Sequence, residues 1–145
     1  MTKEQLEQGM KDACTEYLER FDGRYNDVIK GSFYEVSYEE QTLSIIFDTM
    51  EWEINERGTI HGGAITGMYD AAMGVAANCL AGPPAATTCD ISITFIRGLE
   101  FGQHPIVKTY VVKNGRKLIR LRAEMICQET GNLLSTASGT WMPLG

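Results

Sequence analysis

The stretch from Gly62 to Leu80 constrains the fold most, because it is long, rich in Ala and Met, and almost uncharged. From His61 to Cys89, Asp70 is the only Asp, Glu, Lys or Arg. The pattern predicts a helix, which Gly82-Pro83-Pro84 ends because proline does not continue a helix. A helix that is apolar on all sides is buried. The rest of the chain must therefore fold around it.

The segments on either side of this helix have the alternating pattern of half-buried strands. Two turns are expected between the later strands, at Asn114-Gly115 and at Thr130-Gly131-Asn132. One long helix followed by an antiparallel meander is an α+β layout, in which the antiparallel sheet wraps around the central helix. The predicted strands are residues 32–38, 42–50, 91–95, 105–112, 118–127 and 133–142.

An extra amphipathic helix is predicted at the N-terminus, over residues 3–21, and Asp22-Gly23 ends it. We expect residues 1–25 to be a helical extension that packs on the domain or lies at a dimer edge. Because the chain contains no repeat and no linker, residues 1–145 are expected to form a single domain. The apolar face of the helix consists of Leu6, Met10, Ala13, Tyr17, Leu18 and Phe21.

The composition argues against several classes of function. The net charge is −6 and no basic stripe stands out, so we expect no nucleic-acid partner and no binding to an anionic membrane surface. No apolar run reaches transmembrane length, and the polar N-terminus has no signal-peptide pattern. The 4 cysteines lack the spacing of a metal site, which indicates free thiols in a reducing cytoplasm.

Gly62 and Gly63 open the predicted buried helix. The first turn of a helix has backbone N–H groups without an internal partner, and it carries the positive end of the helix dipole. Glycine lets a ligand come close to these groups, so this helix start is a candidate oxyanion hole for a polarised carbonyl. The alternative is that the two glycines only allow tight packing.

Asp70 is the second candidate, because a lone carboxylate on an apolar helix needs a partner or a function. The alternatives are an Asp that faces solvent or one that Thr66 or a backbone N–H satisfies. Gly62 and Asp70 are eight residues apart, or about 12 Å along one helix. A base must lie about 3 Å from the atom on which it acts. If both groups act on one substrate, Asp70 must come from a second copy of the chain.

These residues together resemble the hotdog-fold thioesterases, in particular the PaaI-like and THEM2-like acyl-CoA branch. The pattern is Asn55, then Gly58-Thr59-Ile60-His61-Gly62-Gly63, then Asp70, then Thr88-Cys89-Asp90 before an alternating strand. The resemblance covers about residues 40–143 and leaves the N-terminal helix outside. The combination is specific, although no single part of it is.

The resemblance implies hydrolysis of an acyl-CoA thioester to a free acid and CoA. Gly62 would bind the thioester carbonyl, and Asp70 of a second subunit would act as nucleophile or general base. Asn55 and His61 would position the thioester or the attacking water, and Thr88 would orient that water or Asp70. The family forms homodimers whose sheets join edge to edge, and we expect two of them to form a homotetramer. CoA would enter as part of the substrate, and no metal or other cofactor is expected.

Substrate-binding residues beyond this set each have two interpretations, because the same residue types serve ordinary structural roles. Gly63 at the helix start is one candidate. Four basic residues are candidates for binding CoA phosphates, and the alternative is that they are solvated charges at turns: Arg97, Lys113, Arg116 and Lys117. Asn55 has the alternative of only organising a turn, His61 of only bonding its loop, and Thr88 of being a plain strand residue.

Two other functions remain open from the sequence. One is a hotdog-fold hydratase or dehydratase, and the other is a non-catalytic module that binds an acyl or aryl ligand. Cys79 and Cys89 are rival nucleophiles, but they are interpreted as small buried residues, and His104 in its turn has no evident partner. A pocket for the acyl tail has candidate walls that are equally typical of plain core, namely Trp52, Met68, Tyr69 and Met73.

Overall fold

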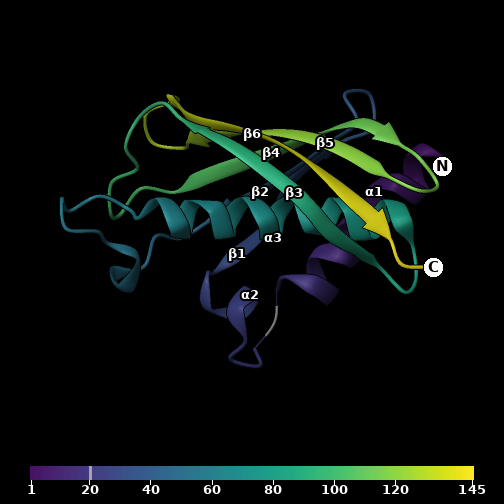
Figure 1. Cartoon of the computed structure of the whole chain (residues 1–145), viewed down its shortest axis with the longest axis horizontal. Helices are drawn as coiled ribbons and strands as arrows, with labels where there is room; N and C mark the ends of the chain where they lie inside the picture. The colour runs from purple at the N-terminus through teal and green to yellow at the C-terminus, as the bar shows by residue number, and fades with distance from the viewer. Residues whose placement is uncertain (20) are drawn as a thin grey trace.

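The structure, a computed structural model, describes residues 1–19 and 21–145. It is an α+β fold in which an antiparallel sheet covers one long helix (Figure 1). The helices are α1 (Lys3–Tyr17), α2 (Tyr25–Val28), a 3₁₀ turn (Glu51–Glu53) and α3 (Gly62–Ala81). The strands are β1 (Gly31–Ser37), β2 (Thr42–Phe47), β3 (Ala86–Phe95), β4 (Pro105–Asn114), β5 (Ile119–Cys127) and β6 (Leu133–Pro143).

The predicted central helix is confirmed as α3, and Gly82 caps it where the sequence places the stop. Its buried side chains are Ala, Ile, Met, Tyr and Val, and they pack under the curved sheet seen above α3 in Figure 1. The opposite face of the helix carries small and polar residues that stay accessible, among them Thr66 and Asp70. In the described part of the chain, no helix combines the length and apolar character needed to span a membrane.

The sheet has the strand order β1-β2-β4-β5-β6-β3. A meander over all of the later strands is therefore wrong, because only β4, β5 and β6 follow one another. Helix α3 carries the chain across the sheet, so that β3 lies at the far edge and pairs with β6 alone. Most of the residues of β3 are exposed. A long edge strand with exposed side chains is a surface to which another strand can add.

The N-terminal helix is shorter than predicted. It ends at Tyr17 rather than Phe21, and the Phe21 side chain is 95% exposed instead of completing the apolar face. Beyond the helix, the Glu19 carboxylate accepts a hydrogen bond from the Phe33 backbone N–H in β1 at 2.9 Å. The buried side chains of α1, which include Met10 and Cys14, join the common core.

The predicted hairpin at Asn114-Gly115 is confirmed, because β4 and β5 pair antiparallel on either side of it. Asn114, which pairs with Ile119, is the last residue of β4, so four residues connect the two strands. The Gly115 N–H donates to the Leu118 carbonyl at 3.0 Å. A Cβ at position 115 would lie 2.6 Å from that same oxygen, which explains the glycine.

Candidate active site

Helix α3 begins with a cap formed by a histidine. His61 is the N-cap residue, and its Nδ1 accepts a hydrogen bond from the Gly63 backbone N–H at 2.8 Å. The His61 carbonyl accepts from Ala64 and Ile65 at 2.9 and 3.1 Å. Within the part of the chain that the structure describes, the Gly62 N–H alone in this turn has no acceptor. It is therefore the donor available to polarise a carbonyl oxygen.

Gly63 lies at the helix start, as expected, but its backbone N–H has another role than substrate binding. Its N–H is already used by the His61 ring, so it is not free to bind a substrate. A Cβ at position 63 would lie 3.0 Å from His61 Nδ1, so the glycine makes room for the ring. Because Nδ1 accepts, the neutral ring carries its proton on Nε2. His61 thus presents an exposed N–H donor beside Gly62.

The histidine cap gives a direct stability prediction. We expect His61→Ala to lower the free energy of unfolding by about 1 kcal/mol, because the Gly63 N–H loses its acceptor. His61→Asn supplies a side-chain oxygen as the N-cap acceptor in place of Nδ1 and should recover most of that loss. Urea unfolding of the three proteins checks this. Equal stability of His61→Ala and the wild type would show that the cap contributes nothing.

Asn55 organises the loop that leads to the helix. Its Oδ1 accepts from the backbone N–H groups of Arg57 and Thr59 at 2.9 and 3.1 Å, and its Nδ2 donates to Thr59 Oγ1 at 3.0 Å. The side chain is thus turned into its own loop, as in the alternative interpretation of Asn55 as a turn residue. It acts on the site by holding the backbone in front of His61.

Arg97 lies close to the helix start. It lines a cavity of about 400 Å³ together with Gly62 and Phe95. Arg57, which the sequence analysis did not single out, lines the same cavity. The two arginines therefore line the Gly62 side of the site. Only the fold reveals this, because the two arginines are 40 positions apart in the sequence.

Asp70 and Thr88 form the second half of the candidate site. Thr88 Oγ1 donates a hydrogen bond to Asp70 Oδ1 at 2.8 Å, from the start of β3 to the middle of α3. Thr66 does not satisfy Asp70, because its hydroxyl donates to the Gly62 carbonyl at 2.8 Å instead. The Asp70 side chain is exposed within a single chain. Asp70 is therefore not a buried carboxylate, although it lies on a largely buried helix.

Gly62 and Asp70 line different cavities. The cavity that holds Asp70 has a volume of about 220 Å³ and also contains Thr88, Trp141 and Asn26. One chain therefore carries two half-sites along α3, separated as the helical rise requires. The Asp70 carboxylate lies on the accessible face of α3 and is open to contact from a second chain.

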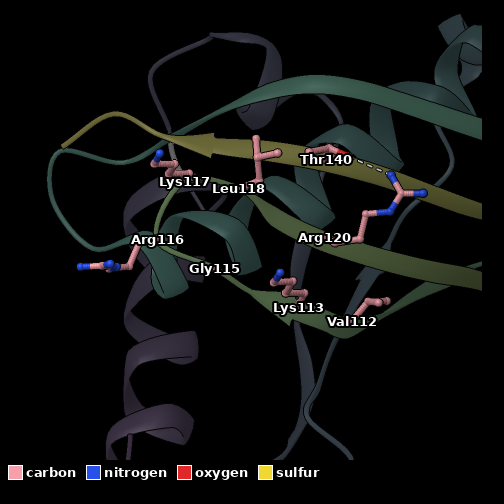
Figure 2. Close-up of a pocket in the computed structure, with 8 residues that line it drawn as sticks. All are labelled: Val112, Lys113, Gly115, Arg116, Lys117, Leu118, Arg120 and Thr140. Carbon is pink, nitrogen blue, oxygen red and sulfur yellow. Dashed lines mark hydrogen bonds between the residues drawn. The ribbon is translucent and has the colours of Figure 1, made fainter.

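The basic hairpin forms a third group of predicted residues. Lys113, Arg116 and Lys117 line a cavity of about 940 Å³ at the β4–β5 turn (Figure 2). Arg120 belongs to the same cavity and donates to Thr140 Oγ1 at 2.8 Å. Figure 1 places this turn near the C-terminal end of α3, away from the helix start. The hairpin is thus remote from Gly62 of its own chain.

Several expectations about other residues are corrected. His104 does have partners: its Nδ1 lies 2.6 Å from Glu129 Oε2, and its Nε2 lies 3.5 Å from Asp48 Oδ1. Hydrogen bonds from the His104 backbone and ring lower the pKa of Glu129 to about 2. Cys89 is exposed, at an irregularity of β3, rather than buried.

The suggested walls of an acyl pocket separate into two kinds. Met68, Tyr69 and Met73 are fully buried and belong to the core. Trp52 is half-exposed and lines a cavity of about 240 Å³ with His61, next to the helix start. No group of three or more His, Cys, Asp or Glu side chains among the described residues is placed to hold a metal ion.

Comparison with known proteins places the chain in a family. The sequence profile of the thioesterase superfamily matches residues 57–133, which include the helix start, Asp70 and Thr88. The chain belongs to the thioesterase superfamily. The predicted family and the predicted hotdog fold are confirmed, and the superfamily is one of thioester hydrolases.

The individual relatives share little sequence identity with this chain. Mouse acyl-coenzyme A thioesterase 13 is 23% identical over 90 residues, which are 62% of this chain and 64% of that protein. The fold resembles that of the PaaI protein from the Escherichia coli phenylacetic acid degradation operon, with a TM-score of 0.83, 16% identity, and 97% and 96% of the two chains covered. A Streptococcus mutans protein solved with bound acetyl CoA has a TM-score of 0.69 and 21% identity, over 79% and 90% of the chains.

Proposed function

We propose that this superfamily member is an acyl-CoA thioesterase, which converts water and an acyl-CoA into a free acid and CoA. The observation that carries the proposal is the pair of half-sites on α3. At the helix start, no described residue accepts the Gly62 N–H, and Asp70 is an accessible carboxylate that Thr88 orients. The mouse relative and the Streptococcus neighbour with bound acetyl CoA support CoA thioesters as the substrate class.

The chemistry follows from these two groups. The Gly62 N–H and the helix dipole stabilise the negative charge that develops on the thioester carbonyl oxygen. Asp70 of a second protomer either takes a proton from water as the water attacks the carbonyl carbon, or attacks that carbon itself. The C–S bond then breaks, and the CoA thiolate leaves and takes up a proton. In the second route, water afterwards cleaves the anhydride formed with Asp70.

A homodimer is part of the proposal, because one chain holds the two half-sites apart. The unpaired edge of β3 can add the same strand of a second copy in an antiparallel pair, which joins the two sheets. Thr88 lies near the start of this strand, and Phe95, which lines the same cavity as Gly62, ends it. Antiparallel pairing therefore brings Thr88 and Asp70 of one protomer toward Gly62 of the other. We expect two such dimers to associate into a tetramer.

The basic hairpin is proposed to bind the phosphates of CoA. Residues Thr88, Trp141, Ile119 and Asn114 form one row across the paired strands β3, β6, β5 and β4. With strands about 4.8 Å apart, this row joins Asp70 to the hairpin over roughly 14 Å of sheet. The hairpin of the protomer that supplies Asp70 is therefore within reach of an extended CoA.

Neutralising the hairpin should weaken binding of the nucleotide part without changing the chemical step. We expect the combined variant Lys113→Ala, Arg116→Ala and Lys117→Ala to raise KM for an acyl-CoA by roughly tenfold, with kcat nearly unchanged. Added salt should raise the wild-type KM and narrow this difference, because the charges are exposed. Steady-state kinetics at several salt concentrations measure both effects.

The control for that prediction is a thioester without a nucleotide, such as the matching acyl-N-acetylcysteamine. Its KM should be the same for the variant and the wild type. An equal rise in KM for both substrates would mean that the hairpin acts through the fold and not through the phosphates of CoA.

The proposed activity is tested by thiol release from a panel of acyl-CoAs. The panel compares phenylacetyl-CoA and hydroxybenzoyl-CoA with short, medium and long fatty acyl-CoAs. Release of CoA from at least one of them is expected, and none at all would overturn the proposal. Addition of water to crotonyl-CoA without thiol release would favour the hydratase, and tight binding without turnover would favour the binding module.

A further inference from the structure

The hydroxyl of Tyr25 lies against α3 between the two half-sites. A Cβ at position 67 would overlap the Tyr25 hydroxyl oxygen, so only glycine admits the tyrosine there. Glycine inside a helix is less favourable than alanine by about 1 kcal/mol, and it therefore needs a structural reason. Tyr25 supplies that reason. Tyr25 lies outside residues 57–133, the segment that matches the family.

Tyr25 also forms part of a cavity at the helix start. The cavity has a volume of about 240 Å³, and its other walls include Trp52, Ile54, His61 and Gly63. Among the residues that the structure describes, none forms a hydrogen bond with the Tyr25 hydroxyl. Burial, followed by the negative charges of Glu53 and Asp70, raises the pKa of this hydroxyl. The group therefore stays protonated at neutral pH and can donate a hydrogen bond.

A buried carboxyl group stands in the wall of the same cavity. The Glu53 side chain is 1% exposed, and its Oε1 accepts from the Met50 backbone N–H at 2.7 Å. Its Oε2 is buried and has no hydrogen-bond partner in the described part of the chain. Unpaired buried polar atoms are rare in folded proteins and call for an explanation. The unpaired Glu53 oxygen and the Tyr25 hydroxyl thus belong to one small cavity, and Tyr25 itself is 51% exposed, so water reaches its side chain in the protomer.

The two cavities beside the helix start differ in charge, and this difference orients the substrate. Arg57 and Arg97 line the cavity that contains Gly62. Among the described residues, no Lys or Arg lines the cavity of Tyr25 and Trp52. The amide carbonyl oxygens in the CoA arm next to the thioester accept hydrogen bonds from guanidinium groups and favour this side, while the phosphates lie farther along the arm, at the basic hairpin. The acyl group, on the other side of the thioester carbonyl, is then directed into the cavity with the aromatic walls.

We propose that Tyr25 determines acyl-group specificity, by donating a hydrogen bond to a hydroxyl or keto oxygen on a compact acyl group in this cavity. The inference rests on the proposed thioesterase function and deepens it. A dry cavity of about 150 Å³ accommodates benzene, so a cavity of this size admits a short or ring-sized acyl group. A plain hydrocarbon group would displace water and leave the hydroxyl unpaired, whereas an oxygenated group pairs with it.

The test compares matched substrates: butanoyl-CoA with 3-hydroxybutanoyl-CoA, and phenylacetyl-CoA with 4-hydroxyphenylacetyl-CoA. In the wild type, we expect the oxygenated member of at least one pair to have a kcat/KM higher by about tenfold or more. Tyr25→Phe should bring that ratio close to one, by raising KM for the oxygenated member alone. Tyr34→Phe, which removes an exposed hydroxyl from β1, is the matched control and should keep the ratio.

A second variant moves the hydroxyl without removing it. Gly67→Ala should displace Tyr25 and lower the same ratio, and adding Gly67→Ala to Tyr25→Phe should change the ratio no further. If ratios close to one are found in the wild type, or if Tyr25→Phe leaves the wild-type ratios unchanged, the proposal is wrong even when thioesters are hydrolysed.

Binding separates this proposal from the proposed function. Calorimetry with non-hydrolysable thioether analogues of the same pairs measures the preference without turnover. A preference that Tyr25→Phe removes supports the cavity assignment, even if no thioester is hydrolysed and the thioesterase proposal fails. No preference in binding, together with active turnover, overturns the role of Tyr25 alone.

Discussion

Asp70→Asn is expected to lower kcat for thioester hydrolysis by about 10²- to 10⁴-fold, the range that a positioned general base contributes. The substitution keeps the shape of the side chain, and the amide oxygen still accepts the hydrogen bond from Thr88. What it removes is the negative charge that takes a proton from water or attacks the carbonyl. Because Asp70 is exposed in the protomer, the melting temperature should stay close to that of the wild type.

The measurement is thiol release under saturating acyl-CoA, with thermal unfolding recorded for the same samples. Asp12→Asn is a suitable control, because it neutralises an exposed carboxylate on α1 and keeps its hydrogen bond from Gln8. A wild-type kcat in Asp70→Asn would exclude Asp70 as base or nucleophile. Thr88→Ala should give a smaller loss of kcat, since it removes only the group that orients the carboxylate.

Gly62→Pro is expected to lower kcat by about 10²- to 10³-fold, the effect of removing one oxyanion-hole donor. Proline lacks the backbone N–H but fits the first position of a helix. The residue before it, His61, has φ −60° and ψ 138°, the extended conformation that precedes proline readily. A Cβ at position 62 would lie 3.5 Å from Phe95 Cζ, an ordinary contact. The helix start should therefore be preserved.

Gly62→Ala is the matched control, because alanine adds the same Cβ and keeps the N–H. It should retain most of the wild-type kcat, whereas equal losses in the two variants would attribute the effect to crowding. Circular dichroism and thermal unfolding of Gly62→Pro check that the helix has formed. If Gly62→Pro is folded and fully active, this N–H does not bind the carbonyl.

Mixing the two inactive proteins tests the shared site. A heterodimer of Asp70→Asn with Gly62→Pro has one site that carries both substitutions and one site that carries neither. Random pairing during coexpression should therefore restore about a quarter of the wild-type activity. If both functional groups came from one chain, the mixture would stay as inactive as its components.

Much of the fold can be predicted from local pattern. The stretch after His61, in which Asp70 is the only charged residue, predicts α3 and the burial of its apolar side chains. The structure leaves accessible only the face that carries Thr66 and Asp70. Gly82 and the two prolines after it mark the end of the helix by backbone chemistry alone. Such features depend on neighbouring residues, so the sequence carries them directly.

Only part of the candidate site can be predicted from such local patterns. The spacing of Gly62 and Asp70 along one helix follows from the helical rise, and this spacing alone predicts two separate half-sites. The partner of Asp70 does not follow from spacing, since Thr88 reaches it from a strand 18 positions later. Only the resemblance to the hotdog thioesterases suggests Thr88 as a group that orients Asp70. The use of the Gly63 N–H by His61 depends on a rotamer of the ring, which spacing does not determine.

By itself, the sequence determined the central helix, its ends and the order of the functional groups along it, because these depend on interactions within a few residues. Only the tertiary structure decided that β3 lies at the edge of the sheet, that Arg57 joins Arg97 beside Gly62, and that Tyr25 rests on Gly67. Each of these joins distant parts of the chain. The contacts form because packing of the whole core repays the entropy of closing the loops between them, and no short stretch of sequence contains that balance.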